Sequence, residues 1–228
     1  MNENQQVLVT VYIPTHNRAV LLERAIQSVI VQTYHNLEVI VVDDCSTDST
    51  ADILDRMNIS FISTKKNTGG PNKGRNIAIS QCKGDFICIA DHDDIWFPNK
   101  IETISVIAEN DFLNQVFMND AELTCNDLST TGLTKLGQIR DAGMLDRIFV
   151  MGCCAAIKGG FLNDILPVPN VYDAHDSWIV NIADGLGRKR IIEQTLQYYR
   201  RHGDNESEFI ANSTRKINKT TYLWKQIY

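Results

Sequence analysis

The chain has 228 residues, of which 43% are hydrophobic and 22% are charged, a composition that suits one large globular domain or a domain with a small subdomain. Its net charge of −6 argues against a general nucleic-acid-binding protein, which would present a basic face. Residues 1–6 are polar without a signal-peptide core, no apolar run reaches the length of a membrane span, and the six cysteines show no CxxC spacing. We therefore expect a cytoplasmic protein with free thiols.

In the first half of the chain, short apolar runs alternate with segments of helical periodicity. The runs predict strands at 7–13, 38–42, 59–64 and 86–90, and the periodic segments predict helices at 19–32, 50–57, 75–82 and 99–109. Residues 67–74 have the composition of a loop. This alternation predicts an α/β fold in which right-handed crossovers build a mainly parallel sheet flanked by helices.

After residue 110 the alternation becomes irregular. The sequence predicts a strand at 115–119, a hairpin or flap at 121–140, a helix and then a strand within 142–157, a helix at 174–183, and short strands at 190–192 and 195–200. Cys153 and Cys154 are expected in the core. No linker separates independent units, so we expect a single domain with halves at 7–109 and 110–205 and a tail at 206–228.

The predicted strand at 86–90 runs directly into Asp91, Asp93 and Asp94, with His92 between them. Three carboxylates at the end of a buried strand repel one another and are costly to desolvate. A divalent cation such as Mg²⁺, which takes oxygen ligands and often shares them with substrate phosphates, would offset both effects. The alternative is a solvated acidic loop that caps the next helix.

Polar residues also end two other predicted strands. Thr15 follows the first, and Asp43 and Asp44 follow the second. Because ligands bind beyond the carboxyl ends of such strands, we expect these residues to converge with the acidic segment. The chain has neither the GxGxxG dinucleotide fingerprint nor a GxxxxGK[ST] phosphate loop. A nucleotide here would instead be held by carboxylates, a cation and basic side chains.

Four segments together resemble the family 2 glycosyltransferases, which have the GT-A fold. They are IPTHNR at 13–18, VVDDCSTDST at 41–50, GRNIA at 74–78 and GDFICIADHDDIWFPNK at 84–100. The resemblance is strong over 7–109 and looser to about 205. In the second half, HDSW at 175–178 and YYRRHGDN at 198–205 resemble bacterial surface-polysaccharide transferases, including rhamnosyltransferase-like members.

The resemblance implies that the chain moves one sugar from a nucleotide diphosphate donor and inverts its anomeric centre. Asp44 would accept a hydrogen bond from a pyrimidine N–H, and Arg75 would approach the diphosphate. The donor-site residues implied in this way are Pro14, Thr15, Asn17, Asp43, Asp44, Lys73, Arg75, Asp91 and His92.

Metal and base are assigned by the same resemblance. Asp93, the second acid of the DxD motif, would bind Mg²⁺ or Mn²⁺, and His202 would complete the metal shell or be a surface histidine. Asp176 is the candidate general base, with Asp173 as its rival, because His175 replaces the usual glutamate of the late acidic motif. For either aspartate, capping of a helix N-terminus is the alternative role.

The sequence thus predicts transfer from a UDP- or dTDP-sugar to a hydroxyl of a glycan or a lipid-linked saccharide. A sugar nucleotidyltransferase and an inactive nucleotide-sugar-binding protein are the rival interpretations. The tail mixes cations with Tyr222, Trp224 and Tyr228, a composition that suits peripheral contact with the inner face of the membrane. A terminal helix packed on the domain explains the same composition.

Overall fold

The computed structural model describes residues 7–67, 71–169 and 174–202, with the backbone alone at 71–75. The strands are β1 (Val9–Thr15), β2 (Leu37–Asp43), β3 (Phe61–Ser63), β4 (Phe86–Ile89), β5 (Ile95–Trp96), β6 (Val116–Thr124), β7 (Thr130–Thr134), β8 (Ala155–Lys158) and β9 (Lys189–Arg200). The helices are α1 (Ala19–Ile30), α2 (Thr50–Arg56), α3 (Pro71–Gln81), α4 (Lys100–Glu109), α5 (Lys135–Asp141), α6 (Gly159–Ile165) and α7 (His175–Gly185). Two 3₁₀ turns, η1 (Asp146–Ile148) and η2 (Gly152–Cys154), precede β8.

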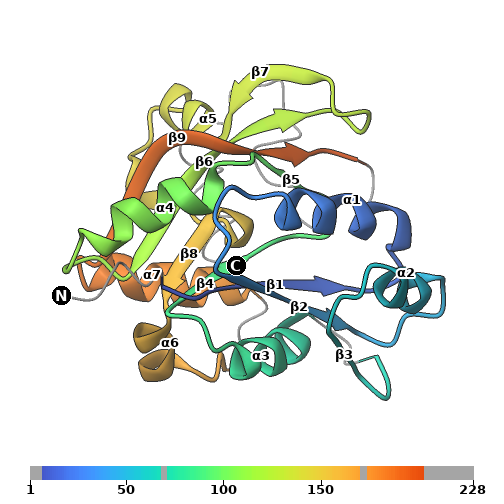
Figure 1. Cartoon of the computed structure of the whole chain (residues 1–228). Coiled ribbons are helices and arrows are strands. Elements are labelled where there is room, and N and C mark those ends of the chain that lie inside the picture. The colour runs from blue at the N-terminus through green and yellow to red at the C-terminus, as the bar shows by residue number, and fades with distance from the viewer. Residues whose placement is uncertain (1–6, 68–70, 170–173, 203–228) are drawn as a thin grey trace.

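All the strands belong to one curled sheet with the order β3-β2-β1-β4-β8-β6-β9-β5, and β7 pairs with β6. From β3 to β4 every pairing is parallel, as the alternation of strands and helices predicted. Beyond β4 the sheet is mixed: β8 runs antiparallel to both of its neighbours, and β6 and β9 are parallel. The predicted mixed α/β architecture is confirmed (Figure 1).

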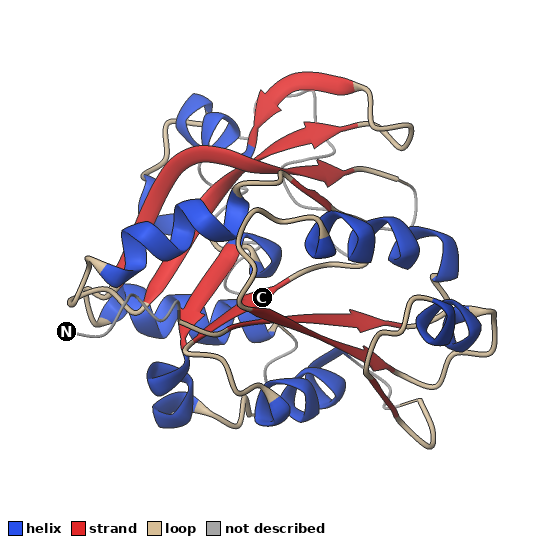
Figure 2. Ribbon diagram, viewed as in Figure 1, coloured by secondary structure: helices blue, strands red, loops and turns tan. Residues whose placement is uncertain are grey.

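Helices cover both faces of the sheet, which explains why β1 reads as a continuous apolar run (Figure 2). Successive residues of a strand point to opposite faces, so Val11 and Tyr12 enter different clusters. Val11 packs with Leu22, Leu54 and Ile104 of α1, α2 and α4. Tyr12 belongs to the other cluster, which includes Ala78, Leu136, Leu162 and Ile179 of α3, α5, α6 and α7.

Three local predictions were wrong. Within 142–157 the expected helix is replaced by the two short 3₁₀ turns η1 and η2, although the expected strand is present as β8. The loop expected at 67–74 is partly helical, because α3 already begins at Pro71, where proline is tolerated in a first helical turn. The two short strands expected near the end of the described chain are one strand, β9. Polar residues Glu193 and Gln194 interrupt its apolar pattern, but pairing with β6 continues across a register shift at Asn119 and Asp120.

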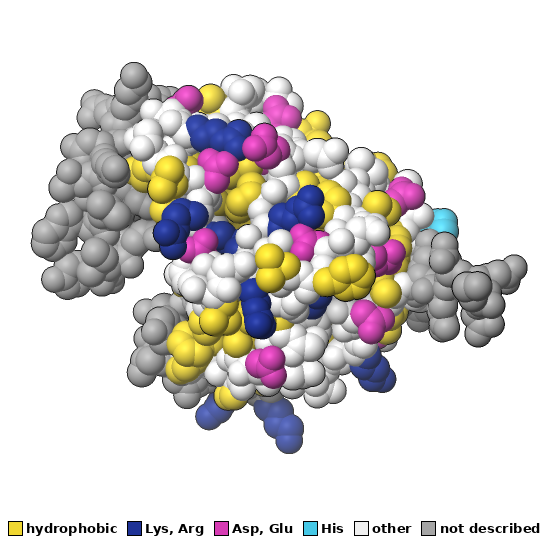
Figure 3. All heavy atoms as spheres, turned by 90° about the vertical axis from the view of Figure 1, so that its left-hand side faces the viewer, with side chains coloured by type: hydrophobic (Ala, Val, Ile, Leu, Met, Phe, Trp, Pro, Cys, Tyr) yellow, Lys and Arg dark blue, Asp and Glu magenta, His cyan; other side chains and the backbone are white. Residues whose placement is uncertain are grey.

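The carboxyl ends of β1, β2 and β9 all point to the right in Figure 1. Figure 3 looks at the opposite side, where positive and negative side chains are interspersed with apolar ones. That side therefore offers no surface of a single charge. Among the described residues, no helix is both long enough and apolar enough to cross a bilayer. The tail proposed to meet a membrane lies outside the described residues.

Candidate active site

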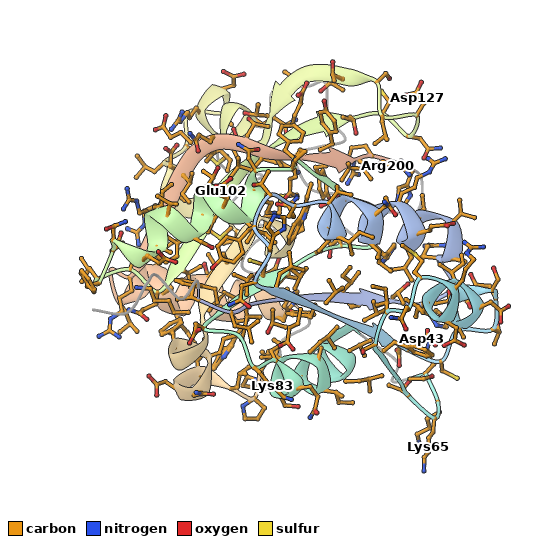
Figure 4. The ribbon with its side chains drawn as sticks, viewed as in Figure 1. Asp43, Lys65, Lys83, Glu102, Asp127 and Arg200 are labelled. Atoms are coloured by element: carbon orange, nitrogen blue, oxygen red, sulfur yellow. The ribbon has the colours of Figure 1, made fainter. Side chains whose placement is uncertain are left out.

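The ends of β1, β2 and β4 lie side by side and bring the predicted donor residues to one edge. Thr15 is the pairing partner of Asp43, and its carbonyl accepts a hydrogen bond of 2.9 Å from the Asp44 N–H. On the other side of β1, the ring of His92 lies 3.3 Å from the carbonyl oxygen of Pro14. Asp44 and the acidic segment therefore flank the same strand end. Figure 4 shows Asp43 at this side of the molecule.

Two carboxylates after β2 are held by hydroxyls and a backbone amide. Asp43 is buried, and its Oδ1 accepts from the Ser46 N–H at 3.1 Å. Half-buried Asp44 accepts from the Thr64 hydroxyl at 2.8 Å. Thr15 is only 4% exposed, and its hydroxyl makes no hydrogen bond within the described part of the chain. A buried hydroxyl of this kind at a strand end suits contact with a ligand.

Asn17 joins the loop after β1 to the loop after β2. It has a positive φ of 51°, its N–H donates to the Ser46 hydroxyl at 2.8 Å, and its side-chain oxygen accepts from the Thr47 N–H at 2.7 Å. Asp48 then accepts from the N–H groups of Ala19 and Thr50, at the starts of α1 and α2. Burial raises the pKa of Asp48, but these hydrogen bonds and that from the Thr50 hydroxyl lower it below its ordinary value. These hydrogen bonds join the loops after β1 and β2 beside Asp44.

The acidic segment after β4 separates into two environments. Asp93 is 8% exposed, and its Oδ2 lies 2.8 Å from Nε2 of His202, which comes from the end of β9. Asp94 is 1% exposed, and its ligand oxygen, that of Asp91 and the thiol of Cys153 all lie within 4.8 Å of one another. The two predicted metal ligands, Asp93 and His202, are therefore in contact. Asp91, Asp94 and Cys153 form a second group of possible metal ligands beside them.

Buried polar contacts hold Asp94 from behind. The Gln197 amide donates to Asp94 Oδ2 at 2.9 Å and accepts from Lys100 Nζ, which also donates to the Cys153 carbonyl at 2.9 Å. The ammonium of Lys100 lies 3.9 Å from the centroid of the Trp96 ring. Burial, and then the negative charges of Asp93 and Asp91, raise the pKa of Asp94 well above its ordinary value. Asp94 and its buried partners therefore hold the acidic segment against the protein interior.

The donor atoms of Asp93 and His202 fit a divalent cation. The Asp93 Oδ2 and the His202 Nε2 lie 2.8 Å apart as a hydrogen-bonded pair, so both atoms could bind one ion. Carboxylate and imidazole ligands together suit Mn²⁺. In the second group, burial raises the pKa of the Cys153 thiol well above its ordinary value, which disfavours the thiolate a metal would need.

Asp176 lies in the first turn of α7 and faces η2. Its Oδ2 accepts from the Gly152 N–H at 3.1 Å, and its Oδ1 accepts from the Ser177 N–H at 2.8 Å. A Cβ at Gly152 would lie 3.3 Å from the Cβ of Asp176 and 3.2 Å from the His175 ring, so glycine permits this approach. Asp176 thus both orients η2 and remains half-buried at the site.

Three predicted site residues fall outside the described structure: Asp173 entirely, and Lys73 and Arg75 in their side chains. Conversely, the sequence interpretation missed Gln197 and Lys100 and placed Cys153 only in the core. A signal existed for Lys100, a cation in the first turn of the helix that follows the acidic segment. Gln197 lies 103 residues from Asp94, so no local pattern links them.

Comparison with solved structures identifies the fold. The chain is similar to Staphylococcus aureus TarS in complex with UDP-GlcNAc, with a TM-score of 0.72, 20% identity, and coverage of 91% of this chain and 62% of that one. It is also similar to glucosyl-3-phosphoglycerate synthase from Mycobacterium tuberculosis, solved with Mn²⁺, UDP and glucosyl-3-phosphoglycerate, with a TM-score of 0.63, 15% identity, and coverage of 90% and 76%. The fold is therefore the GT-A fold.

Sequence comparison matches part of the chain to a known family. The chain matches the model of glycosyl transferase family 2 over residues 10–119. It is 27% identical over 225 residues to UDP-Glc:alpha-D-GlcNAc-diphosphoundecaprenol beta-1,3-glucosyltransferase WfaP from Escherichia coli, covering 96% of this chain and 86% of that protein. Several other curated relatives, all glycosyltransferases by name, are longer, and the chain spans about a third of their length.

Proposed function

We propose that this chain is an inverting glycosyltransferase that moves a sugar from a UDP- or dTDP-sugar to a hydroxyl of a glycan or a lipid-linked saccharide. The observation that carries the proposal is the gathering of Asp44, the Asp93–His202 pair and Asp176 around one end of the sheet. The relatives support the substrate class: WfaP is named for UDP-Glc and a diphosphoundecaprenol acceptor, and TarS was solved with UDP-GlcNAc.

In this proposal the donor nucleotide lies over the ends of β1 and β2. Asp44 accepts a hydrogen bond from the N–H of a pyrimidine base, and the Thr15 hydroxyl, which is buried and has no hydrogen bond in the described structure, contacts the nucleotide. Asp91 and His92 lie next along the edge, toward the ribose and the sugar. Lys73 and Arg75 of α3 would approach the diphosphate.

Asp93 and His202 would hold Mn²⁺ or Mg²⁺. When bound, the cation offsets the negative charge that grows on the departing diphosphate. Asp93 follows β4 and His202 follows β9, and the fold brings the two side chains into contact. The protein would therefore hold both ligands in place before the cation binds. Asp94, Gln197 and Lys100 fix the segment that carries Asp93.

Asp176 would act as the general base. Inversion in a single displacement requires a group that takes the proton of the acceptor hydroxyl as its oxygen attacks the anomeric carbon. Two backbone N–H groups orient the Asp176 carboxylate. One of them belongs to Gly152 of η2, the turn that also contains Cys153, beside the acidic segment. Asp173 is the alternative base.

A thermal-shift screen of UDP-, dTDP- and GDP-sugars with Mn²⁺, with Mg²⁺ and with a chelator tests the proposal. A ligand at 100 times its Kd stabilises a protein by about 2.7 kcal/mol. We expect stabilisation by a pyrimidine nucleotide that requires the metal, followed by release of the nucleoside diphosphate when an acceptor is added. A preference for guanine would contradict the role of Asp44, and binding without any transfer or donor hydrolysis would favour the inactive binding protein.

A further inference from the structure

Two cations flank one aromatic ring at the end of β9. Lys135 Nζ lies 4.5 Å from the centroid of the Tyr199 ring, and Arg201 Cζ lies 5.7 Å from the same centroid. Arg201 also donates from Nη1 to the Tyr199 hydroxyl at 3.3 Å. Tyr199 is 7% exposed and belongs to the hydrophobic cluster, so it holds the two cations on a rigid support.

This pair lies at the same edge of the sheet as the candidate active site. Arg201 directly precedes His202, which contacts Asp93. Lys135 is the first residue of α5, in the second half of the chain, and its ammonium reaches the ring of Tyr199 on β9. Tyr199 lies three residues before His202. The two cations therefore lie beside the His202 end of the site.

Lys135 differs from other cations of the second half. Arg140, Arg147 and Arg190 each form an ion pair with an acidic side chain. Within the ranges that the structure describes, Lys135 forms none, although it is half-buried. Burial, and next the positive charge of Arg201, lower its pKa to about 8. Two like charges held close together favour an anion between or beside them.

We propose that Lys135 and Arg201 form a subsite for a phosphate group of the acceptor. This deepens the proposed function: the acceptor would be a saccharide linked to a phosphate or diphosphate. Phosphate could also come from the donor, but the residues proposed to bind the base and ribose of the nucleotide come from the ends of β1, β2 and β4, whereas Lys135 comes from α5, in the second half of the chain.

The test uses binding as well as turnover. The probes are an alkyl N-acetylglucosaminyl diphosphate, the matching alkyl N-acetylglucosaminide without phosphate, and UDP with Mn²⁺, each titrated calorimetrically into the full chain. The variants are Lys135→Gln, Lys135→Arg and, as a matched control, Lys65→Gln, since Lys65 is exposed and points into solvent in Figure 4. Thermal melting establishes that each variant is folded.

We expect Lys135→Gln to weaken binding of the diphosphate probe about tenfold or more, the effect of one charge-assisted hydrogen bond. Binding of UDP should be unchanged, Lys135→Arg should retain most of the affinity, and Lys65→Gln should match the wild type. Equal affinity of the wild type for the two alkyl probes would overturn the subsite, and so would a loss of UDP affinity in Lys135→Gln, which would assign the cations to the donor. If the diphosphate probe binds as expected but no donor supports transfer, the subsite stands and the proposed function fails.

Discussion

Residues 91–94, which follow β4, have the sequence Asp-His-Asp-Asp. Although three of the four are aspartates, their side chains lie in different environments. Asp93 contacts His202, Asp94 contacts Gln197, and His92 contacts the Pro14 carbonyl. The partners come from β9 and β1, so the fold and not the local sequence distinguishes the acids. Asp93 has an imidazole beside it, and a carboxylate with an imidazole suits a divalent cation such as Mn²⁺.

At Asp176 we predict a separation of chemistry from binding. In Asp176→Asn, the amide oxygen can still accept from the Gly152 N–H, so η2 and the donor site should keep their structure. Without a base, turnover should fall by about 10²–10⁴-fold, while UDP affinity stays unchanged. Steady-state kinetics and calorimetry measure the two quantities. The exposed Asp164→Asn on α6 is the matched control. Full turnover in Asp176→Asn would remove this residue from the role.

At the scale of elements, a buried lysine joins α4, β9 and η2 behind the acidic segment. In Lys100→Met the Gln197 oxygen and the Cys153 carbonyl would lose their shared donor. Leaving buried acceptors unpaired should cost about 2–4 kcal/mol of the free energy of unfolding. Urea unfolding measures this cost.

A double variant tests whether Lys100 and Gln197 stabilise the protein through their shared hydrogen bond. Lys100→Met with Gln197→Leu removes both partners, so its loss should be smaller than the sum of the two single losses. Strict additivity would mean that Lys100 and Gln197 do not act together.

The loop between α4 and β6 depends on Asp111. Its carboxylate accepts from the N–H groups of Leu113 and Asn114 and from the side chains of Asn114 and Arg190. Burial raises the pKa of Asp111, but these hydrogen bonds outweigh it and hold the pKa well below its ordinary value. The carboxylate is bound in the folded chain, so its stabilising effect is present above the unfolded pKa of about 3.9 and is lost as pH falls below it.

We therefore predict that Asp111→Asn lowers the free energy of unfolding by about 1–2 kcal/mol at pH 7. The difference from the wild type should shrink as the pH falls below about 4. Urea unfolding at several pH values checks this, with Asp164→Asn again as the control. A difference that stays constant with pH would show that charge at Asp111 does not contribute.

For the whole molecule, the sequence predicted the first half better than the second. The helices and strands from β1 to α4 follow local periodicity, and each parallel strand pairs with one that is near in the chain, except for the pairing of β1 with β4. In the second half, β9 pairs with β6 across a register shift and supplies β5 with its partner. Such nonlocal pairing leaves little mark in a local pattern.

The site divides in the same way. Thr15, Asp44 and Asp93 could be proposed from the sequence because they end strands or belong to motifs that resemble a family. Gln197 and Lys135 could not, because their positions relative to these residues exist only after β9 and α5 have packed. His202 was predicted from resemblance, and the structure brings it to Asp93.

The most direct test of the account is calorimetric titration of UDP into the wild type with Mn²⁺, into the wild type with a chelator, and into Asp93→Asn with Mn²⁺. We predict binding in the first case and at least about tenfold weaker binding in the other two, because in the proposed function Asp93 and His202 would hold the cation that meets the diphosphate. Equal affinity in all three titrations would contradict the account.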